Sequence, residues 1–325
     1  MAISFMMLII IIAKGRIMRL LIVGAGSTGG YFGARLAEAG RDVTFLVRPA
    51  RAAQLHEQGL RIVSPHGNAT LHPKIVTAAD IKETYDAVLL TVKGFHLQAA
   101  LDDIAPAIGP ETMILPVLNG MQHMDAIAQR FSAHNLVGCA LKVATVLDDD
   151  GSVVQLNPLQ DLAYGELDGS TTARIASLDQ FMQGAPIGAR LSPFIRREMW
   201  EKWILLAGLG AATCLTRGTI GEIEACPGGT AFVLDLLDEI IAIVKTVGEA
   251  PSDEFSQAVR QQLTAKGSPL VSSMFRDLHR GRDVEVEAIL GDLVRRGTEA
   301  GLKTPLLSAA TVHLRVYQNK VAASR

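Results

Sequence analysis

The clearest chemical signature in the sequence is a glycine-rich turn that directly follows a short apolar run at residues 19–23. It has the pattern G-x-G-x-x-G and consists of Gly24, Ala25, Gly26, Ser27, Thr28 and Gly29. In such a turn the first glycine permits a sharp bend, the second lets a pyrophosphate approach the backbone, and the third lets the next helix pack against the strand. The N–H groups and dipole at the helix start attract phosphate. The pattern predicts a dinucleotide site; the alternative is a turn kept for packing alone.

A basic residue stands where the second strand of such a unit should end. NAD sites usually place Asp or Glu about 20 residues after the glycines, where the carboxylate binds the ribose 2′-hydroxyl. This chain has Arg48 there, with Arg51 close behind. A guanidinium is suited to bind a 2′-phosphate, and no carboxylate stands there to repel it. We therefore expect NADP(H) as the cofactor, against the alternative that Arg48 is an ordinary solvated loop charge.

Two further polar residues follow predicted strands. Lys93 ends the run Thr91-Val92-Lys93, and Asn119 is followed by Gly120. The carboxyl ends of strands in an open parallel sheet line the ligand crevice, so both side chains should point toward the nicotinamide. Asn-Gly is also a common turn pair, so either residue could serve a turn instead.

Lys202 is the candidate proton donor. It lies in a predicted helix whose continuation, residues 204–215, is almost entirely apolar and small, which places the lysine at the edge of the core. A lysine that is partly desolvated there could donate a proton to an alkoxide. Because Glu198 precedes it by four residues, a solvated i,i+4 ion pair is the competing interpretation. The spacing leaves both open.

An alternating framework of strands and helices must position these residues. Short β-branched runs alternate with helical stretches from Met18 onward, which is typical of a parallel sheet. Strands are predicted at 19–23, 43–47, 60–63, 70–76, 86–92, 112–117 and 136–140, and helices at 28–39, 94–102 and 122–131. Residues 142–166 contain short alternating runs with a hairpin-like turn at 148–151. Beyond Pro193 the pattern becomes helical, at 194–215, 231–249, 253–265 and 284–300.

The predicted fold class is therefore α/β: a Rossmann-type, doubly wound and mostly parallel sheet, followed by an all-helical C-terminal domain. We expect an NADP-binding domain over residues 18–192 and a helical substrate and dimerisation domain over 193–325. Residues 1–17 are interpreted as a dispensable N-terminal extension. Their apolar run at 6–13 is shorter than the about 20 residues that span a bilayer, and it lacks the flanks of a secretory signal.

The composition excludes several classes of partner. Lys and Arg number 31 against 33 Asp and Glu, a net charge of -2, so no basic excess exists to neutralise nucleic acid. Three cysteines, Cys139, Cys214 and Cys226, have no disulfide or zinc spacing, which is typical of a reducing compartment. The eight histidines show no metal spacing, and none is assigned to catalysis. We expect a cytoplasmic protein with no metal, no nucleic acid and no membrane partner.

Six separated elements together resemble the ketopantoate reductase (2-dehydropantoate 2-reductase) family over nearly the whole chain from Met18. They are the glycine turn, Arg48, Thr91-Val92-Lys93, Asn119-Gly120-Met121, Lys202 after an aromatic residue, and the segment 272–277 leading to 284–287. Their order and spacing are far more specific than the glycine pattern alone.

The resemblance implies a role for individual residues. Lys202 matches the general acid of the family, and Glu285 matches the acidic residue near the nicotinamide ribose and the substrate. Asn119 matches a residue that touches both cofactor and substrate, and Ser273 matches a contact to the substrate carboxylate. Positions that match cofactor contacts also include Arg48 for the 2′-phosphate, Lys93 and Ala144.

Three positions depart from the family pattern. Asparagines are expected four and eight residues after the lysine and just before Gly221, but this chain has Leu206, Gly210 and Ile220. A pocket that loses hydrogen-bonding groups discriminates differently between substrates.

The function expected from the sequence is the NADPH-dependent reduction of a small 2-oxo acid to a 2-hydroxy acid, with 2-dehydropantoate or a close relative as substrate. The alternatives are a reductase of a more apolar 2-oxo acid or ketone, and a non-catalytic NADP-binding sensor. The helical domain offers apolar surface for a homodimer, although without a specific signature.

Overall fold

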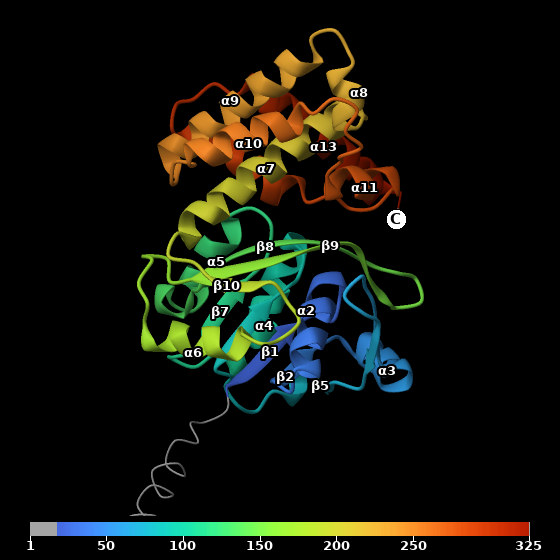
Figure 1. Ribbon diagram of the computed structural model, residues 1–325, viewed down its shortest axis with the longest axis vertical. Coiled ribbons are helices and arrows are strands. Elements are labelled where there is room, and N and C mark those ends of the chain that lie inside the picture. The colour runs from blue at the N-terminus through green and yellow to red at the C-terminus, as the bar shows by residue number, and fades with distance from the viewer. Residues whose placement is uncertain (1–17, 325) are drawn as a thin grey trace, which may run out of the picture.

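The computed structural model of the chain describes residues 18–324 (Figure 1). An α/β part carries a helical part above it in the view of Figure 1, and the predicted fold class is confirmed. The first sheet has the strand order β5-β2-β1-β6-β7 and is parallel throughout. Its strands are β1 (Arg19–Val23), β2 (Asp42–Leu46), β5 (Lys74–Val76), β6 (Ala87–Leu90) and β7 (Met113–Pro116).

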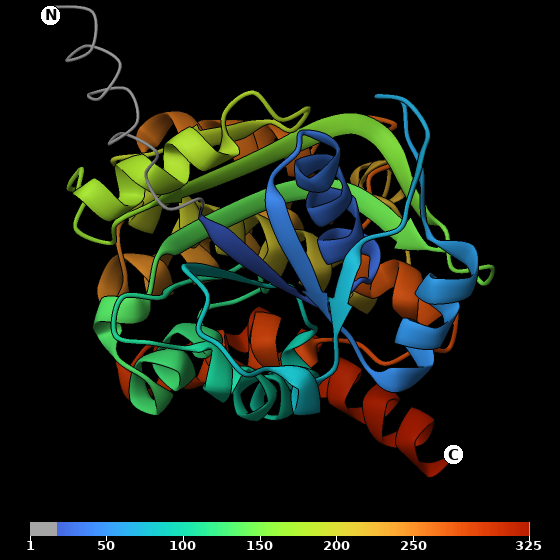
Figure 2. The same cartoon turned by 90° about the horizontal axis from the view of Figure 1, so that it is seen from below.

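The central strand β1 is buried on both faces, as its continuous apolar run predicts. Leu20 and Ile22 pack in one core with the helix α2 (Ser27–Glu38). Leu21 and Val23 face the opposite core, which contains α4 (Leu97–Ile104) and α5 (Gln122–Arg130) and continues into the helical part. Figure 2 shows the blue strands of this sheet between α2 and the blue-green helices of the other face.

A second, mixed sheet lies beyond α2 and consists of β10, β9, β3 and β4 in that order, with β8 paired to β9. Strands β8 and β9 form a long antiparallel hairpin, which confirms the predicted turn at residues 148–151. A Cβ on Gly30 of α2 would lie 2.9 Å from Val153 of β9, so the helix packs tightly against this sheet. Its strands are β3 (Leu60–Val63), β4 (Ala69–Leu71), β8 (Gly138–Leu147), β9 (Val153–Gly165) and β10 (Ala189–Leu191).

The single strand predicted at 70–76 is wrong. The structure has two short strands there: β4 pairs with β3 in the second sheet, and β5 pairs with β2 in the first. Pro73 separates them. Because proline has no backbone N–H to give to a ladder, the chain changes sheets at this residue.

The helical part is built around the long helix α7 (Ile195–Thr216), which is buried along most of its length. Trp203 of this helix donates its indole N–H to the carbonyl of Ile289 at 2.8 Å. That carbonyl belongs to η5 (Glu287–Gly291), a π-helical turn that interrupts the helix predicted at 284–300. The remaining helices are α8 (Ile220–Glu224), α9 (Gly229–Val247), α10 (Asp253–Leu263), α11 (Ser273–His279), α12 (Asp292–Glu299) and α13 (Pro305–Ala323).

Several elements of the α/β part were not predicted. They are α3 (Pro49–Gln58), α6 (Ala173–Met182) and the 3₁₀ turns η1 (Ala78–Asp80), η3 (Ala105–Ala107) and η4 (Ala133–Asn135). The helix predicted at 94–102 begins as the 3₁₀ turn η2 (Gly94–His96) and continues as α4. The domain boundary predicted at 192/193 lies between β10 and α7 and stays a prediction, and the predicted extension 1–17 lies outside the described residues.

Among residues 18–324, no helix is long and apolar enough to cross a membrane, and no group of three or more His, Cys, Asp or Glu side chains could hold a metal ion.

Candidate active site

The glycine turn joins β1 to α2 and leaves open space in front of the helix. Gly24 has a φ of +97°, a conformation that glycine adopts without strain. A Cβ on Gly29 would lie 2.2 Å from the Gly24 carbonyl oxygen and 2.3 Å from the Thr91 hydroxyl oxygen, so only glycine allows this close packing. A Cβ on Gly26, the N-cap of α2, would meet no atom within 4 Å. The turn therefore fits a pyrophosphate at the start of α2.

Arg51 supports this turn from α3. Its guanidinium donates to the carbonyl of Ala25 at 3.0 and 3.2 Å and to the carbonyl of Gly151 in the β8–β9 hairpin at 3.1 Å. Burial lowers the pKa of Arg51. The Arg51 side chain thus links the glycine turn to the second sheet through hydrogen bonds to backbone carbonyl oxygens.

Arg48 stands exposed between the end of β2 and α3, of which it is the N-cap. Its Nη2 lies 3.4 Å from Nδ1 of His96, which belongs to the turn η2 after β6. Burial, followed by the charge of Arg48, lowers the pKa of His96. Sequence reasoning missed this histidine, because the two side chains meet only when neighbouring crossover segments fold over the same sheet edge.

Glu285 connects the helical part to the strand ends of the first sheet. Its carboxylate accepts hydrogen bonds from the backbone N–H of Gly94 at 3.0 Å and from the Asn119 side-chain amide at 3.2 Å. Lys93 is also engaged across the two parts, in an ion pair with Asp277 of α11 at 3.1 Å. The residues predicted at the ends of two strands are therefore brought to the same interface as Glu285.

Lys202 lies beside this interface in a small cavity of about 10 Å³, room for roughly one water molecule. Burial lowers the pKa of Lys202 to about 8, while Cys139 and Glu285 act in the opposite direction. The Glu198 carboxylate accepts instead from Arg190 at 2.9 Å, so the structure lacks the i,i+4 ion pair that competed with the catalytic interpretation. The lining residues are Leu118, Gly120, Cys139, Met199, Lys202, Trp203 and Leu206.

The three positions that depart from the family pattern are apolar or filled in the structure. Leu206 lines the cavity of Lys202. A Cβ on Gly210 would lie 2.5 Å from the terminal methyl of Met274, so a methionine of α11 occupies the space beside this glycine. Ile220 is fully buried. The wall that α7 presents next to Lys202 is consequently apolar.

Two predicted residues lie outside the cluster of Lys202, Asn119 and Glu285. Ser273 is exposed at the first position of α11. Ala144 lies at an irregularity of the β8–β9 hairpin, where the pairing register shifts between residues 143 and 145. Within residues 18–324, no side-chain hydrogen bond links either of them to that cluster.

Two buried residues near Lys202 were not predicted. Cys139 of β8 lines the same cavity, and burial raises the pKa of its thiol far above its usual range. His123 of α5 is 3% exposed, and neither ring nitrogen has a hydrogen-bond partner among the described residues. Burial, followed by the charge of Lys202, lowers the pKa of His123 to about 3. The histidine is therefore neutral, and nothing in its local sequence signals this environment.

The arrangement unites a dinucleotide-binding turn, strand-end polar groups and a desolvated ammonium at the junction of two parts of the chain. This combination defines the class of nicotinamide-dependent oxidoreductases that bind the cofactor on a Rossmann-type sheet.

Comparisons with known proteins place the chain within that class. Residues 20–169 match the family described as ketopantoate reductase PanE/ApbA, and residues 194–318 match its C-terminal region. The chain belongs to the ketopantoate reductase family.

Individual relatives agree with this assignment. An uncharacterized oxidoreductase, YkpB of Bacillus subtilis, is 30% identical over 93% of this chain and 99% of its own. A 2-dehydropantoate 2-reductase of Mesorhizobium japonicum is 27% identical over 92% of this chain and 97% of its own. The crystal structure of 2-dehydropantoate 2-reductase from Geobacter metallireducens superimposes with a TM-score of 0.82, at 27% identity, over 92% of this chain and 99% of that one.

Proposed function

We propose that the protein reduces a 2-oxo acid to the corresponding 2-hydroxy acid with NADPH. The observation that carries this proposal is the position of Lys202, whose ammonium lies desolvated beside the strand end of Asn119 and opposite Glu285. A carbonyl reduction needs a proton donor at the point where the oxygen becomes negative, and a pKa near the working pH suits that task. A pKa of about 8 leaves Lys202 mostly protonated at neutral pH and able to release its proton.

NADPH is favoured as the cofactor by Arg48. The nicotinamide supplies the hydride when it is bound. The chain's own residues hold the phosphates at the glycine turn and offer the exposed Arg48 guanidinium, with His96 beside it, to a 2′-phosphate. No carboxylate forms a hydrogen bond or an ion pair with Arg48 among the described residues.

The remaining residues orient the reacting groups. Glu285 fixes the Asn119 amide and the N–H of Gly94, so the strand ends next to the substrate are held in one geometry. Lys202 donates its proton to the carbonyl oxygen as negative charge develops there, and its ammonium stabilises that charge in a water-poor cavity. Ser273, exposed at the start of α11, is the proposed contact for the substrate carboxylate.

Within the class of 2-oxo acids, to which 2-dehydropantoate belongs, the apolar wall next to Lys202 sets which substrate is preferred. Leu206, the filled space beside Gly210 and the buried Ile220 leave no hydrogen-bonding group on these positions for a substrate hydroxyl. An unpaired hydroxyl against such a wall is unfavourable. This observation favours a 2-oxo acid without a hydroxyl at that place over 2-dehydropantoate.

The test is the decay of NADPH absorbance with purified protein across a panel of 2-oxo acids that includes 2-dehydropantoate and unbranched, branched and aromatic analogues. We expect turnover with at least one of them and a higher kcat/KM for analogues that lack a hydroxyl. If NADPH binds but no 2-oxo acid is reduced, the protein is the NADP-binding sensor that the loss of three asparagines also permits.

A further inference from the structure

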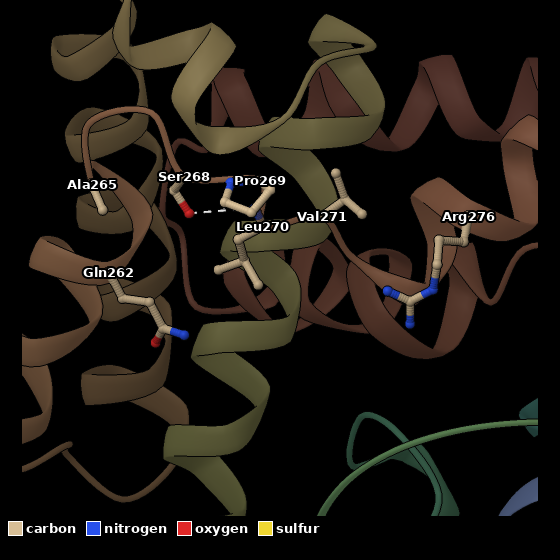
Figure 3. Close-up of a pocket in the computed structure, with 7 residues that line it drawn as sticks. All are labelled: Gln262, Ala265, Ser268, Pro269, Leu270, Val271 and Arg276. Atoms are coloured by element: carbon tan, nitrogen blue, oxygen red, sulfur yellow. Dashed lines mark hydrogen bonds between the residues drawn. The ribbon is translucent and has the colours of Figure 1, made fainter. Parts of the chain in front are cut away.

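Two arginines outside the cavity of Lys202 differ in what surrounds them. Figure 3 shows Arg276 at one end of a hollow between α10 and α11, and this hollow shares no lining residue with the Lys202 cavity. Arg48, by contrast, is connected to the glycine turn. It lies two residues after Leu46, the last residue of β2, whose carbonyl accepts a hydrogen bond from the N–H of Gly24 at 2.9 Å. The sheet edge that carries Arg48 therefore adjoins the phosphate-binding turn.

His96 contacts Arg48 at this edge. Arg48 follows β2 and His96 follows β6, and these are the two strands on either side of β1, from which the glycine turn starts. Nη2 of Arg48 lies 3.4 Å from Nδ1 of His96, and both side chains are exposed. Within residues 18–324, no carboxylate forms a hydrogen bond or an ion pair with either side chain. Two basic groups thus stand together next to the phosphate-binding turn.

The contact between them requires a neutral imidazole. A guanidinium can only donate hydrogen bonds, so Nδ1 of His96 accepts one here and carries no proton. Partial burial lowers the pKa of His96, and the charges of Arg48 and, more weakly, of Lys93 act in the same direction. The charge of Asp283, from the segment before η5, acts in the opposite direction. At pH 7, His96 is therefore the uncharged member of the pair.

A phosphate bound at this edge would change the charge of His96. A phosphate monoester has a second pKa of about 6, so it is mostly a dianion above pH 7 and offers three acceptor oxygens. A dianion bound by Arg48, within reach of the imidazole, favours the imidazolium, in which both ring nitrogens donate. NADH has an uncharged ribose hydroxyl in place of this phosphate and does not favour the charged form.

We propose that His96 takes up a proton when the 2′-phosphate of NADPH binds to Arg48, so that the selection of NADPH over NADH depends on pH. The proposal rests on the proposed function and deepens it, because it makes His96 the second cation of the 2′-phosphate site. In the free protein the pKa of His96 lies below its usual value, and in the complex it is raised. Between these two values the affinity for NADPH falls as the pH rises, by up to about tenfold per pH unit for one proton. Arg48 alone gives no such dependence, because a guanidinium stays charged throughout this range.

The experiment measures the proton uptake by titration calorimetry in two buffers that differ in their heat of ionisation. At about pH 7.5, we expect uptake of about 0.5 to 1 proton on binding of NADPH and none on binding of NADH. The ligand 2′,5′-ADP, which has the 2′-phosphate and no nicotinamide, should show the same uptake as NADPH. Between about pH 7 and 8.5, the preference of the wild type for NADPH should fall about tenfold, as a shift of one pKa unit implies.

Two variants and a control assign the proton to His96. His96→Gln keeps a hydrogen-bond donor that does not titrate, so proton uptake should disappear and NADPH affinity should no longer depend on pH. His96→Arg carries a permanent charge and should bind NADPH at about pH 8.5 at least as tightly as the wild type does at about pH 7, without uptake. The control, His56→Gln, changes an exposed histidine in the last turn of α3 and should retain the uptake. NADH affinity should stay unchanged in all three variants.

The outcomes separate the proton uptake from the function on which it rests. Absence of uptake in the wild type, or uptake that persists in His96→Gln, overturns the role of His96, and NADPH can still be the preferred cofactor. Equal affinities of the wild type for NADPH and NADH overturn the proposed cofactor together with the site. Because binding of 2′,5′-ADP involves no reduction, uptake that depends on His96 supports the site even where no 2-oxo acid is turned over.

Discussion

Replacing Lys202 by Met tests the proposed mechanism at its decisive residue. The methionine keeps the length and packing of the lysine stem and removes both the charge and the proton. Because the ammonium lies in a cavity with room for roughly one water molecule, bulk solvent has little access to replace it as donor. General acid catalysis is worth about 10²–10⁴-fold. We expect kcat to fall by that factor, while the dissociation constant for NADPH changes little, since the phosphates are held by the glycine turn.

Stopped-flow reduction assays measure kcat, and fluorescence titration measures NADPH binding. A pH series adds a second signature: with a donor pKa of about 8, the wild-type kcat/KM should be flat below that pH and fall about tenfold per unit above it, and the variant should lose this decline. Lys245→Met, at an exposed lysine in the last turn of α9, is the control. A Lys202→Met enzyme that keeps more than about a tenth of wild-type kcat, well outside the general-acid range, refutes the assignment.

Three further changes probe the supports of the site. Arg48→Ala should weaken NADPH binding by about 10- to 100-fold and leave NADH binding nearly unchanged; equal affinities of the wild type for both would contradict this. Glu285→Gln should lower kcat and move the inflection of the pH profile below about 8, because the Glu285 charge raises the pKa of Lys202; an unmoved inflection would exclude that coupling. Trp203→Phe leaves the buried Ile289 carbonyl unpaired and should reduce the free energy of unfolding in urea by about 1–3 kcal/mol, and no loss would mean that water replaces the indole.

The local features of the fold follow from the sequence. The glycine turn was predictable because the strand, the bend and the start of the helix follow one another directly in the sequence. Each depends only on residues close to it in the chain. The division of residues 70–76 into two strands was also signalled, because Pro73 stands in the middle of this segment. Helix α13 has Ser, Thr, His and Gln spread among its apolar residues, so its weak periodicity does not announce a helix.

The contacts that assemble the candidate active site could not be predicted from local sequence patterns. Glu285 meets Gly94 across 191 residues, and Lys93 meets Asp277 across 184. Such pairs depend on how the helical part docks onto the sheet, which no local propensity specifies. The family resemblance indicated that Glu285 and Lys93 belong to the site. Their hydrogen-bond and ion-pair partners were known only from the structure, as were the hydrogen bonds from Arg51 to the backbone carbonyls of Ala25 and Gly151.

The π-helical turn at residues 287–291 sets the direction in which Glu285, before it, and Arg296, after it, point around the helix axis. Both side chains contact the α/β part. Before the turn, Glu285 binds Gly94; after it, Arg296 of α12 binds Asp125 of α5 at 2.7 Å. A π turn accommodates one residue more than an α turn, and each residue of a helix rotates the chain by about 100°. Deletion of a single residue here would restore regular α geometry and swing one of the two side chains away from its partner. The extra residue of this π-helical turn therefore lets Glu285 and Arg296 contact the α/β part at the same time.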